Sequence, residues 1–294
     1  MKNPMKALAV NQKNAPYYFL APVIIIFLIF MIYPIIHSFV LSFQKFDSGV
    51  YSFVGFGNYM TLMKDPVFWS ALKNTFIYLL VQVPCMVIIS LALAVILDQK
   101  FLRLKPLFRM SLFLPSITAL VAYAIVFKML LNTEYGIINH LFQSIGLPKV
   151  DWLNTTWGAR ISIIMAITWR WTGYNMVIMI AGLQAIPTSL FESACIDGAN
   201  AWQKLRKITI PMMKPIILFI SITSTIGTLM LFDESLILTN GGPDNATITT
   251  GHHLYNSGFQ FFKFGYAASI SYMLVLIIAL LSFIQFKLSK RENS

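Results

Sequence analysis

Few side chains in this chain could do chemistry, and none of them forms a recognisable catalytic set. Neither a G-x-x-x-x-G-K-[ST] phosphate-binding loop nor the H-E-x-x-H spacing of a zinc hydrolase occurs in its 294 residues. His37, His140 and the adjacent His252 and His253 have no carboxylate or cysteine at helical spacing beside them. We therefore expect no metal site and no enzymatic activity here, and we interpret the histidines as ordinary interfacial or loop residues.

A few ionisable residues lie inside long apolar stretches, where a charge is costly and usually faces a partner or a water-filled cavity. Arg170 lies near the middle of one stretch, and Asp233 and Glu234 lie towards the outer end of the next. Lys128 is near enough to the end of its stretch to reach the outer surface. Two interpretations stay open: an ion pair of Arg170 with Glu234 or Asp233 that joins two helices, or polar groups that line a cavity.

The residues around Arg170 are of the types that bind sugars. A sugar has hydroxyls on its rim and C–H groups on its faces, so its site needs flat aromatic rings beside polar groups. Trp169, Trp171, Tyr174 and Asn175 supply that mixture. The alternative, that several of these side chains only pack between helices, also stays open.

A polar island between two apolar stretches has the signals of two short helices. Ser189 and Glu192 have the spacing of a capping box, which predicts a helix start at this point. Gly198 suits the left-handed residue that closes such a helix, and Asn200 can cap a second one. We expect Pro211 to end the second helix.

One side of the first of these helices carries Phe191, Ala194 and Cys195 at helical spacing. This side either packs back on the helix ends of the same chain or fits a groove on a partner protein. Because two helices joined by a glycine bend can move as one unit, the island could transmit force.

The composition indicates that the residues named above belong to a membrane protein. The chain is 57% hydrophobic and 11% charged, with a mean hydropathy of +0.70, whereas roughly a quarter of the residues of a soluble domain are charged. A membrane-crossing helix needs about 20 mainly apolar residues. Six stretches qualify, without the alternation of barrel strands: Tyr17–Phe43, Asn74–Leu97, Met110–Leu131, Ile161–Ile186, Ile216–Thr239 and Ala267–Phe286.

The first stretch is longer than the core of a signal peptide and lacks a cleavage pattern, so we interpret it as a retained span.

The net charge of +11 does not indicate nucleic acid, because the cations are not gathered into one stripe. They are gathered at the segments that an even number of spans places on one side: Lys2, Lys6, Lys13, Lys100, Arg103, Lys105, Arg109, Lys204, Arg206, Lys207, Lys214, Lys287, Lys290 and Arg291. The positive-inside rule assigns that side, with both termini, to the cytoplasm.

The segments assigned to the outside are rich in aromatic residues. The rings in Asp47–Lys73 and Asn132–Arg160 include Phe53, Phe56, Tyr59, Phe68, Trp69, Tyr135, Phe142, Trp152 and Trp157. Such rings favour the membrane interface, which predicts re-entrant or interfacial helices. A docking surface for an external protein is the alternative. Cys85 lies in a span and Cys195 in the polar island, so we expect no disulfide between them.

The polar island resembles the cytoplasmic coupling motif of ABC importer permeases, which has Glu-Ala-Ala, a Gly three residues on and then Ile-x-Leu-Pro. Here Ser193 replaces the first Ala and Ile210 the Leu. Further segments in the family's order resemble the larger-type permease of carbohydrate importers of the maltose and glycerol-phosphate type. They begin at Pro16-Tyr17-Tyr18, Phe53-Val54-Gly55, Leu114-Pro115, Ala181-Gly182-Leu183, Leu238-Thr239-Asn240 and Phe264-Gly265-Tyr266, and together they cover nearly the whole chain.

The resemblance implies a role for two sets of residues. Those that would contact an ATPase subunit are Glu192, Ala194, Asp197, Gly198, Ile208 and Pro211. The candidates for the substrate path are Ser116, Trp169, Arg170, Trp171, Tyr174, Asn175, Ser224, Thr228 and Glu234. The family has asparagines or a Phe near its sugar where this chain has Ile167, Gly227 and Leu231, which implies that a sugar is not held as maltose is.

The resemblance also implies an all-α, six-span type I ABC importer permease fold and the partners of that family. These are a second, homologous permease, two ATPase subunits that bind ATP and magnesium, an external solute-binding protein, a carbohydrate and membrane lipid. This chain itself would need no cofactor. The rival is an ion-coupled secondary transporter working alone, which would need internal repeats or broken helices at the midplane but no coupling loop.

The expected organisation therefore follows the membrane. It consists of a cytoplasmic tail (1–16), a first membrane helix (17–44), an external segment (45–73), a core of five helices (74–286) that contains the coupling loop (187–215), and a second cytoplasmic tail (287–294).

Overall fold

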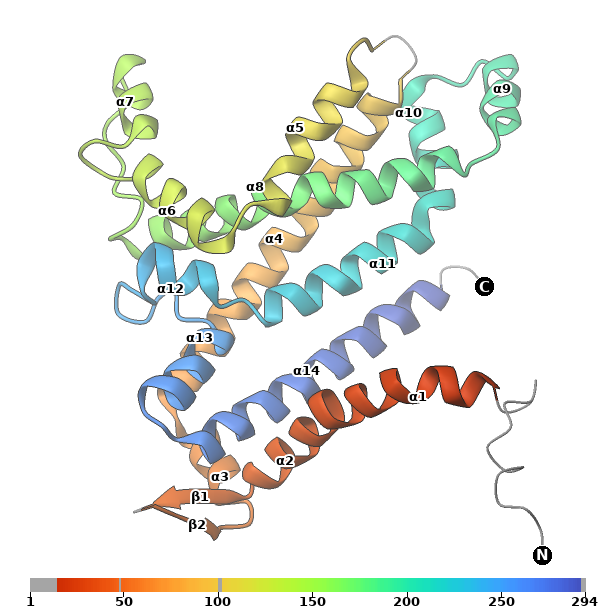
Figure 1. Cartoon of the computed structure of the whole chain (residues 1–294). Helices are drawn as coiled ribbons and strands as arrows, with labels where there is room; N and C mark the ends of the chain where they lie inside the picture. The colour runs from red at the N-terminus through yellow and green to blue at the C-terminus, as the bar shows by residue number, and fades with distance from the viewer. Residues whose placement is uncertain (1–14, 48, 100–101, 292–294) are drawn as a thin grey trace, which may run out of the picture. The chain divides into compact units, whose positions relative to one another are not determined.

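The computed structural model describes residues 15–47, 49–99 and 102–291 (Figure 1). The N-terminal tail up to residue 14, Lys100 and the last three residues of the C-terminal tail lie outside the described residues. The described chain divides into two units: residues 15–62 with 257–272, and residues 63–256 with 273–291.

The smaller unit contains the first membrane helix and the segment that follows it. Its elements are α1 (Ala15–Phe27), the π-helical turn η2 (Leu28–Ile32), α2 (Tyr33–Leu41), β1 (Gln44–Asp47), β2 (Val50–Phe53), most of α3 (Gly57–Lys64), η4 (Asn256–Gln260) and the start of α14 (Phe264–Arg291). Buried Asn58 joins α3 to the end of the first helix by donating to the carbonyls of Ser42 and Gln44, at 2.8 and 2.9 Å. Tyr272 of α14 donates to the carbonyl of Ile35.

The hairpin in this unit differs from the prediction of helices alone in the aromatic-rich external segment. β1 and β2 pair antiparallel, with Gln44 opposite Phe53 and Asp47 opposite Val50. A glycine with φ +88°, Gly49, lies at the turn, a conformation that residues with a side chain rarely adopt. The fold is therefore helical with one short two-stranded addition.

The larger unit contains the other long helices. Its elements are α4 (Pro66–Asp98), α5 (Lys105–Ile117), α6 (Leu120–Leu130), α7 (Ile137–Ser144), α8 (Thr156–Gln184), α9 (Thr188–Ile196), α10 (Ala201–Lys204), the π-helical turn η3 (Leu205–Thr209), α11 (Ile210–Leu229), α12 (Asp233–Thr239), α13 (Thr250–Tyr255) and the rest of α14. Helix α8 packs against α4, α5 and α11 (Figure 1). Side chains such as Ala94, Met176, Met179 and Met213 fill the core between these helices.

Four helices of the described chain are long and apolar enough to cross a membrane: Ala15–Leu41, Pro66–Asp98, Ala201–Leu229 and Phe264–Ser289. Two bent pairs, α5 with α6 and α8 with α9, meet the same test together and raise the number to six. The angle between α5 and α6 is 102°, so the predicted third span is not a single straight helix. The predicted fifth span is also interrupted, because α11 ends at Leu229 and α12 begins at Asp233.

The crossing of α5 and α8 depends on a glycine. A Cβ atom at Gly173 of α8 would lie 1.7 Å from the carbonyl oxygen of Leu112 in α5. A contact of this length cannot exist, so only a residue without a side chain lets the two backbones approach this closely.

We expect Gly173→Ala to lower the melting temperature of the purified protein, since separating two packed helices costs about 1–3 kcal/mol. Gly227→Ala in α11 is the matched control, because nothing lies within 4 Å of its added methyl group. This control should keep or raise the melting temperature, since alanine favours a helix over glycine by about 1 kcal/mol. Equal melting temperatures for the two variants, measured by differential scanning fluorimetry, would contradict the close crossing.

Candidate substrate cavity and coupling loop

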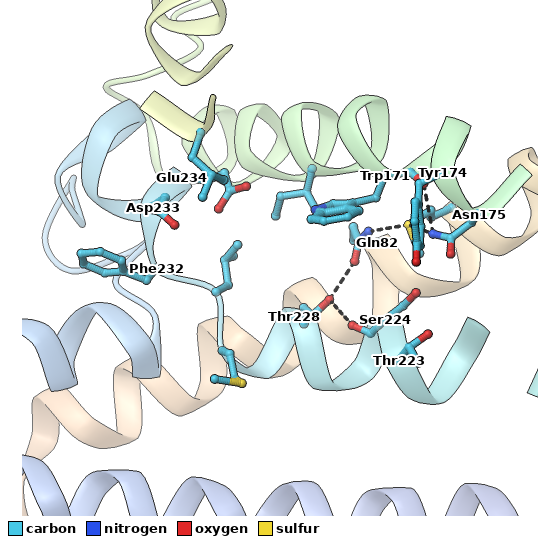
Figure 2. Close-up of a pocket in the computed structure, with 16 residues that line it drawn as sticks. Gln82, Trp171, Tyr174, Asn175, Thr223, Ser224, Thr228, Phe232, Asp233 and Glu234 are labelled. Atoms are coloured by element: carbon cyan, nitrogen blue, oxygen red, sulfur yellow. Dashed lines mark hydrogen bonds between the residues drawn. The ribbon is translucent and has the colours of Figure 1, made fainter. Parts of the chain in front are cut away.

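A cavity of about 350 Å³ lies between α4, α8, α11 and the interruption before α12 (Figure 2). Its wall combines apolar, aromatic and polar side chains, and none of them is basic. The lining residues are Gln82, Met86, Leu120, Ile167, Trp171, Tyr174, Asn175, Thr223, Ser224, Gly227, Thr228, Met230, Leu231, Phe232, Asp233 and Glu234.

Two helix breaks form part of this wall. Leu120 is the first residue of α6, and residues 230–232 separate α11 from α12. Each break leaves backbone carbonyls without a helical partner. Arg170 donates from Nη2 to the carbonyl of Thr118 at the first break, at 3.1 Å, and Thr249 donates from Oγ1 to the carbonyl of Leu231 at the second, at 2.5 Å. Both breaks are therefore supported by side chains from distant parts of the chain.

The polar side of the cavity is connected by hydrogen bonds (Figure 2). Thr228 of α11 donates to the side-chain oxygen of Gln82 in α4, at 3.0 Å, and Thr228 and Gln82 are both buried. Asn175 of α8 donates to the carbonyl of Trp171, at 3.1 Å. These contacts hold amide and hydroxyl groups at fixed positions on three helices, an arrangement suited to hydrogen bonding with a polar solute.

Two aromatic rings of α8 supply flat surfaces beside these polar groups. The rings of Trp171 and Tyr174 meet edge to face with their centroids 5.8 Å apart, and 37% and 43% of these residues' surfaces remain exposed. An exposed ring face can stack on the C–H face of a sugar. The wall thus has both features that the sequence analysis required of a sugar site.

The structure brings six of the nine predicted path residues to this cavity: Trp171, Tyr174, Asn175, Ser224, Thr228 and Glu234. The other three lie elsewhere. Trp169 packs against Phe127 and Tyr123 of α6, with centroids 5.3 and 6.4 Å away, and the Ser116 hydroxyl donates to the carbonyl of Phe113 at 2.7 Å.

Arg170 is buried behind the cavity wall, and of the two interpretations left open, the direct ion pair with Glu234 or Asp233 is not formed. The ring of Tyr123 takes the place of that contact. The guanidinium carbon lies 4.5 Å from the ring centroid, and the phenol hydroxyl donates to a carboxylate oxygen of Glu234. A cation over a ring face is attracted by the ring's quadrupole, so Tyr123 links the cation on α8 to the carboxylate on α12.

Sequence reasoning missed other residues of the wall, among them Gln82, Met86 and Thr223. Gln82 could have been found, because it is a lone amide in the apolar segment Val81-Gln82-Val83. Met86 and Thr223 give no such signal, since their types are common in membrane helices.

The polar island forms a bent pair of helices that only partly follows the prediction. Gly198 has φ +74°, as predicted, and the amide of Ala199 donates to the carbonyl of Ala194 at 2.8 Å, which closes α9. Asn200 caps α10 as predicted, and Gln203 completes a capping box with bonds of 2.8 and 2.9 Å.

The predicted capping box of Ser189 and Glu192 was wrong. Helix α9 begins at Thr188 with Pro187 as its N-cap, and no side chain caps it. Ser189 therefore already lies within the helix, so its amide and hydroxyl are not at the capping position. Glu192 is exposed and free to meet a partner surface, as are Asp197 and Gly198.

Pro211 does not end the second helix, which was a further wrong prediction. α10, η3 and α11 form one helix over Ala201–Leu229, and Pro211 lies at its surface just after the π-helical turn. A proline inside a helix lacks its N–H group and crowds the carbonyl four residues before it, and the π-helical turn that lies just before Pro211 accommodates both effects. Ile208 is half-buried and packs on the core between α4, α8 and α11.

The side of α9 that carries Phe191, Ala194 and Cys195 is divided between the two interpretations. Phe191 packs back on the core of the same chain, whereas Cys195 is exposed and accepts a contact from the Lys204 ammonium at 3.3 Å. An open groove of about 820 Å³ runs between the island and the ends of α4 and α8, past Phe191, Glu192 and Cys195.

The histidine pair lies in a buried network, whereas we expected ordinary interfacial or loop residues. His252 contacts the Ser235 hydroxyl at 2.9 Å through Nδ1, and His253 contacts the Asp65 carboxylate at 3.0 Å through Nε2. Burial, with His253 beside it, lowers the pKa of His252 to about 4, so this ring is neutral at pH 7. Within the described ranges, no group of three His, Cys, Asp or Glu could hold a metal ion.

Comparisons with known proteins agree with these features. The model of the family described as "binding-protein-dependent transport system inner membrane component" matches residues 53–293. The chain is 47% identical over 280 residues to the lactose transport system permease protein LacF of Rhizobium radiobacter, covering 94% of each protein. It is 35% identical over 281 residues to the arabinooligosaccharides transport system permease protein AraP of Bacillus subtilis (strain 168), covering 95% of this chain and 90% of AraP.

A solved structure supports the fold. One chain in the crystal structure of a bacterial ABC transporter that imports the acidic polysaccharide alginate superposes with a TM-score of 0.85 at 23% identity. The superposition covers 96% of this chain and 98% of that one. The predicted fold of an ABC importer permease is therefore confirmed.

The link between Tyr123 and Glu234 can be tested by removing one oxygen atom. We expect Tyr123→Phe to lower the melting temperature of the purified protein, because a buried carboxylate that loses its donor costs about 1–3 kcal/mol. Tyr174→Phe, at an exposed ring, is the control and should leave the melting temperature unchanged. Equal values for the two variants would show that the bond to Glu234 does not stabilise α12.

Proposed function

Since the chain belongs to the family of binding-protein-dependent transport system inner membrane components, we propose that it is the permease subunit of an ATP-driven importer for a carbohydrate. The observation that carries this proposal is the cavity in which exposed Trp171 and Tyr174 rings stand beside the bonded pair of Gln82 and Thr228. The names of LacF and AraP, which refer to lactose and arabinooligosaccharides, support a glycoside or oligosaccharide.

We propose further that the saccharide is neutral. The cavity wall contains the carboxylates of Asp233 and Glu234 and no Lys, Arg or His. Arg170 directly precedes the lining residue Trp171 in the sequence, but it is buried behind the wall with its ring partners Tyr123 and Trp171. Carboxylates accept hydrogen bonds from sugar hydroxyls but repel another carboxylate, so an acidic sugar would be disfavoured here.

Energy for transport would come from partner subunits. We propose that α9 and the Gly198 bend, within residues 187–215, dock on one of two ATPase subunits, which bind ATP and magnesium. Exposed Glu192, Asp197 and Pro211 would contact that subunit, and half-buried Ala194 and Ile208 would position the loop. A second, homologous permease would complete the translocation path. This chain then needs no cofactor of its own.

The proposed orientation in the cell membrane follows the cation asymmetry of the sequence. Both termini and residues 187–215 would lie in the cytoplasm, and α7, α12 and α13 would lie at the outer side, where an external solute-binding protein delivers the sugar. With this orientation, the two tails proposed from the sequence, 1–16 and 287–294, would both lie in the cytoplasm.

One observation favours the rival function of an ion-coupled transporter working alone. The breaks between α5 and α6 and between α11 and α12 are the kind of broken helix that such transporters use. Against it stand the family membership and the bent helix pair α9–α10, which a transporter without ATPase subunits would not need.

Uptake by proteoliposomes separates the two functions. We expect vesicles that contain the chain with its second permease, ATPases and binding protein to accumulate radiolabelled lactose or arabinooligosaccharides only when ATP is supplied. Accumulation driven by a proton or sodium gradient without ATP would contradict the importer.

The same assay tests the cavity. Trp171→Ala should reduce uptake at least tenfold, about the loss expected when a stacking contact worth 1.4 kcal/mol or more is removed. Trp169→Ala, on the same helix but off the cavity wall, should reduce it less. A larger effect at Trp169 would move the substrate path towards α6.

The coupling loop can be tested through the backbone conformation of Gly198. Nothing lies within 4 Å of a Cβ atom at this position, so a substitution changes the φ preference without a clash. We expect Gly198→Val to lose ATP-driven uptake and co-purification of the ATPase, because a β-branched residue strongly disfavours positive φ. Gly198→Asn should retain both, since asparagine tolerates this conformation. Wild-type behaviour of Gly198→Val would contradict the assigned role of this bend.

A further inference from the structure

The connection between α6 and α8 contains a short helix, α7, with no part in the cavity or the coupling loop. Six residues separate it from the end of α6, and eleven separate it from the start of α8. Figure 1 shows α7 on the side of the larger unit where α6 ends and α8 begins. The helix therefore lies close to the level at which two membrane helices end.

The inner side of α7 is fixed by a buried amide. Asn139 is 1% exposed, and its Nδ2 donates to the carbonyls of Thr133 and Val150, at 3.1 and 2.9 Å. Its Oδ1 accepts from the Val150 amide at 3.1 Å and from the Trp152 indole at 3.0 Å. Four bonds to one side chain hold the helix in one rotation about its axis.

That rotation turns an aliphatic stripe outward. Ile137, Leu141 and Ile145 recur every four residues, with 54%, 58% and 71% of their surfaces exposed. His140, Gln143 and Ser144 are also exposed and lie on the neighbouring side of the helix. The outer surface of α7 is thus half apolar and half polar, and the helix itself contains no Lys, Arg, Asp or Glu.

Aromatic residues flank this helix on both sides. Tyr135 is 75% exposed before it, and Trp157 is 65% exposed at the start of α8, where the Arg160 guanidinium lies 5.1 Å from its ring centroid. Exposed Tyr and Trp residues at the ends of membrane helices typically mark the level of the lipid headgroups. An exposed salt bridge of 2.8 Å joins Glu134, before α7, to Lys149, after it.

We propose that α7 is an interfacial helix whose occupant is the outer leaflet of the bilayer, with Ile137, Leu141 and Ile145 among the acyl chains. The stripe offers no aromatic or arginine anchor and no hydrogen-bonding group, the features that concentrate binding energy in protein interfaces. Three aliphatic side chains also provide far less than the roughly 800 Å² per partner of a stable protein interface. A lipid surface needs only apolar area beside a polar side, which α7 has.

This placement would give α6 a fixed outer end. Helix α6 begins at the first helix break and contacts α12 through Tyr123 and Glu234, so its position affects the cavity wall. A helix held in the interface by lipid limits how far α6 can tilt. The assignment to the outer leaflet rests on the proposed orientation, whereas the contact with lipid does not.

Site-directed fluorescence tests the proposal in the assembled complex. Cys85 and Cys195 are replaced by Ser, and a bimane label is attached to Leu141→Cys or, as the matched control, to Gln143→Cys. The complex is reconstituted into phosphatidylcholine nanodiscs with or without a lipid that carries a nitroxide near the headgroup. We expect the nitroxide lipid to quench the label at residue 141 about threefold more than the label at residue 143, and aqueous iodide to show the opposite order.

Each other outcome overturns the proposal. Quenching of residue 141 by iodide as strong as that of residue 143 would place the stripe in water. Protection of residue 141 from both quenchers, lost when the second permease or the binding protein is left out, would assign the stripe to a protein partner. ATP-driven uptake measured on the same labelled complexes keeps a failure of the importer function distinct from a failure of the lipid contact.

Discussion

The structure depends on one constraint: a backbone carbonyl at membrane depth must find a donor inside the protein. Water is absent from the hydrocarbon, and an unpaired polar group there costs several kcal/mol. Two membrane helices are nevertheless broken, one after Ile117 and one after Leu229. Both breaks are possible because Arg170 donates to the Thr118 carbonyl and Thr249 to the Leu231 carbonyl. The donors lie 52 and 18 residues away in the sequence from the carbonyls that they bind.

The cavity is a consequence of these breaks. The chain at residues 230–232 leaves the helical path, which opens space between α8 and α11 and turns Asp233 and Glu234 into its wall. Glu234 is only 3% exposed, and the phenol of Tyr123 satisfies one of its oxygens. Arg170 thus has two tasks, supporting the first break and holding the ring that orients Glu234. A cation that holds the protein together in this way is not available to bind a substrate, which leaves the wall without positive charge.

The polar island of residues 187–215, which we propose as the coupling loop, is built on a different principle. Its shape comes from local backbone rules: a glycine with positive φ closes α9, and a reciprocal pair of Asn200 and Gln203 starts α10. The helix that follows runs without interruption from Ala201 into α11, as far as the break before the cavity. A displacement of the loop could therefore reach the cavity wall along one continuous helix.

The sequence by itself determined what short-range chemistry controls. Apolar length predicted a six-span membrane protein, and local patterns predicted the left-handed Gly198 and the cap at Asn200. The same local reasoning placed Trp171, Tyr174 and Asn175 at the cavity, because they share one helix with the polar residue Arg170. Local rules failed at Ser189, because the helix begins before the predicted capping residue. They also failed at Pro211, because a π-helical turn accommodates the proline.

Only the tertiary structure decided where the helices break and which residues from other helices complete the wall. Pro115 is a local signal for a helix break within residues 110–131, but the bend of 102° depends on a donor that belongs to α8. Gln82 reaches the cavity because it accepts from Thr228, 146 residues away. Trp169 turns to α6 although Ile167 and Trp171, two residues away on either side, line the cavity, since two helical steps of about 100° each point a side chain to nearly the opposite side. Hydrogen bonds and packing between separate segments settle these positions, and the sequence of one segment contains only one of the two partners.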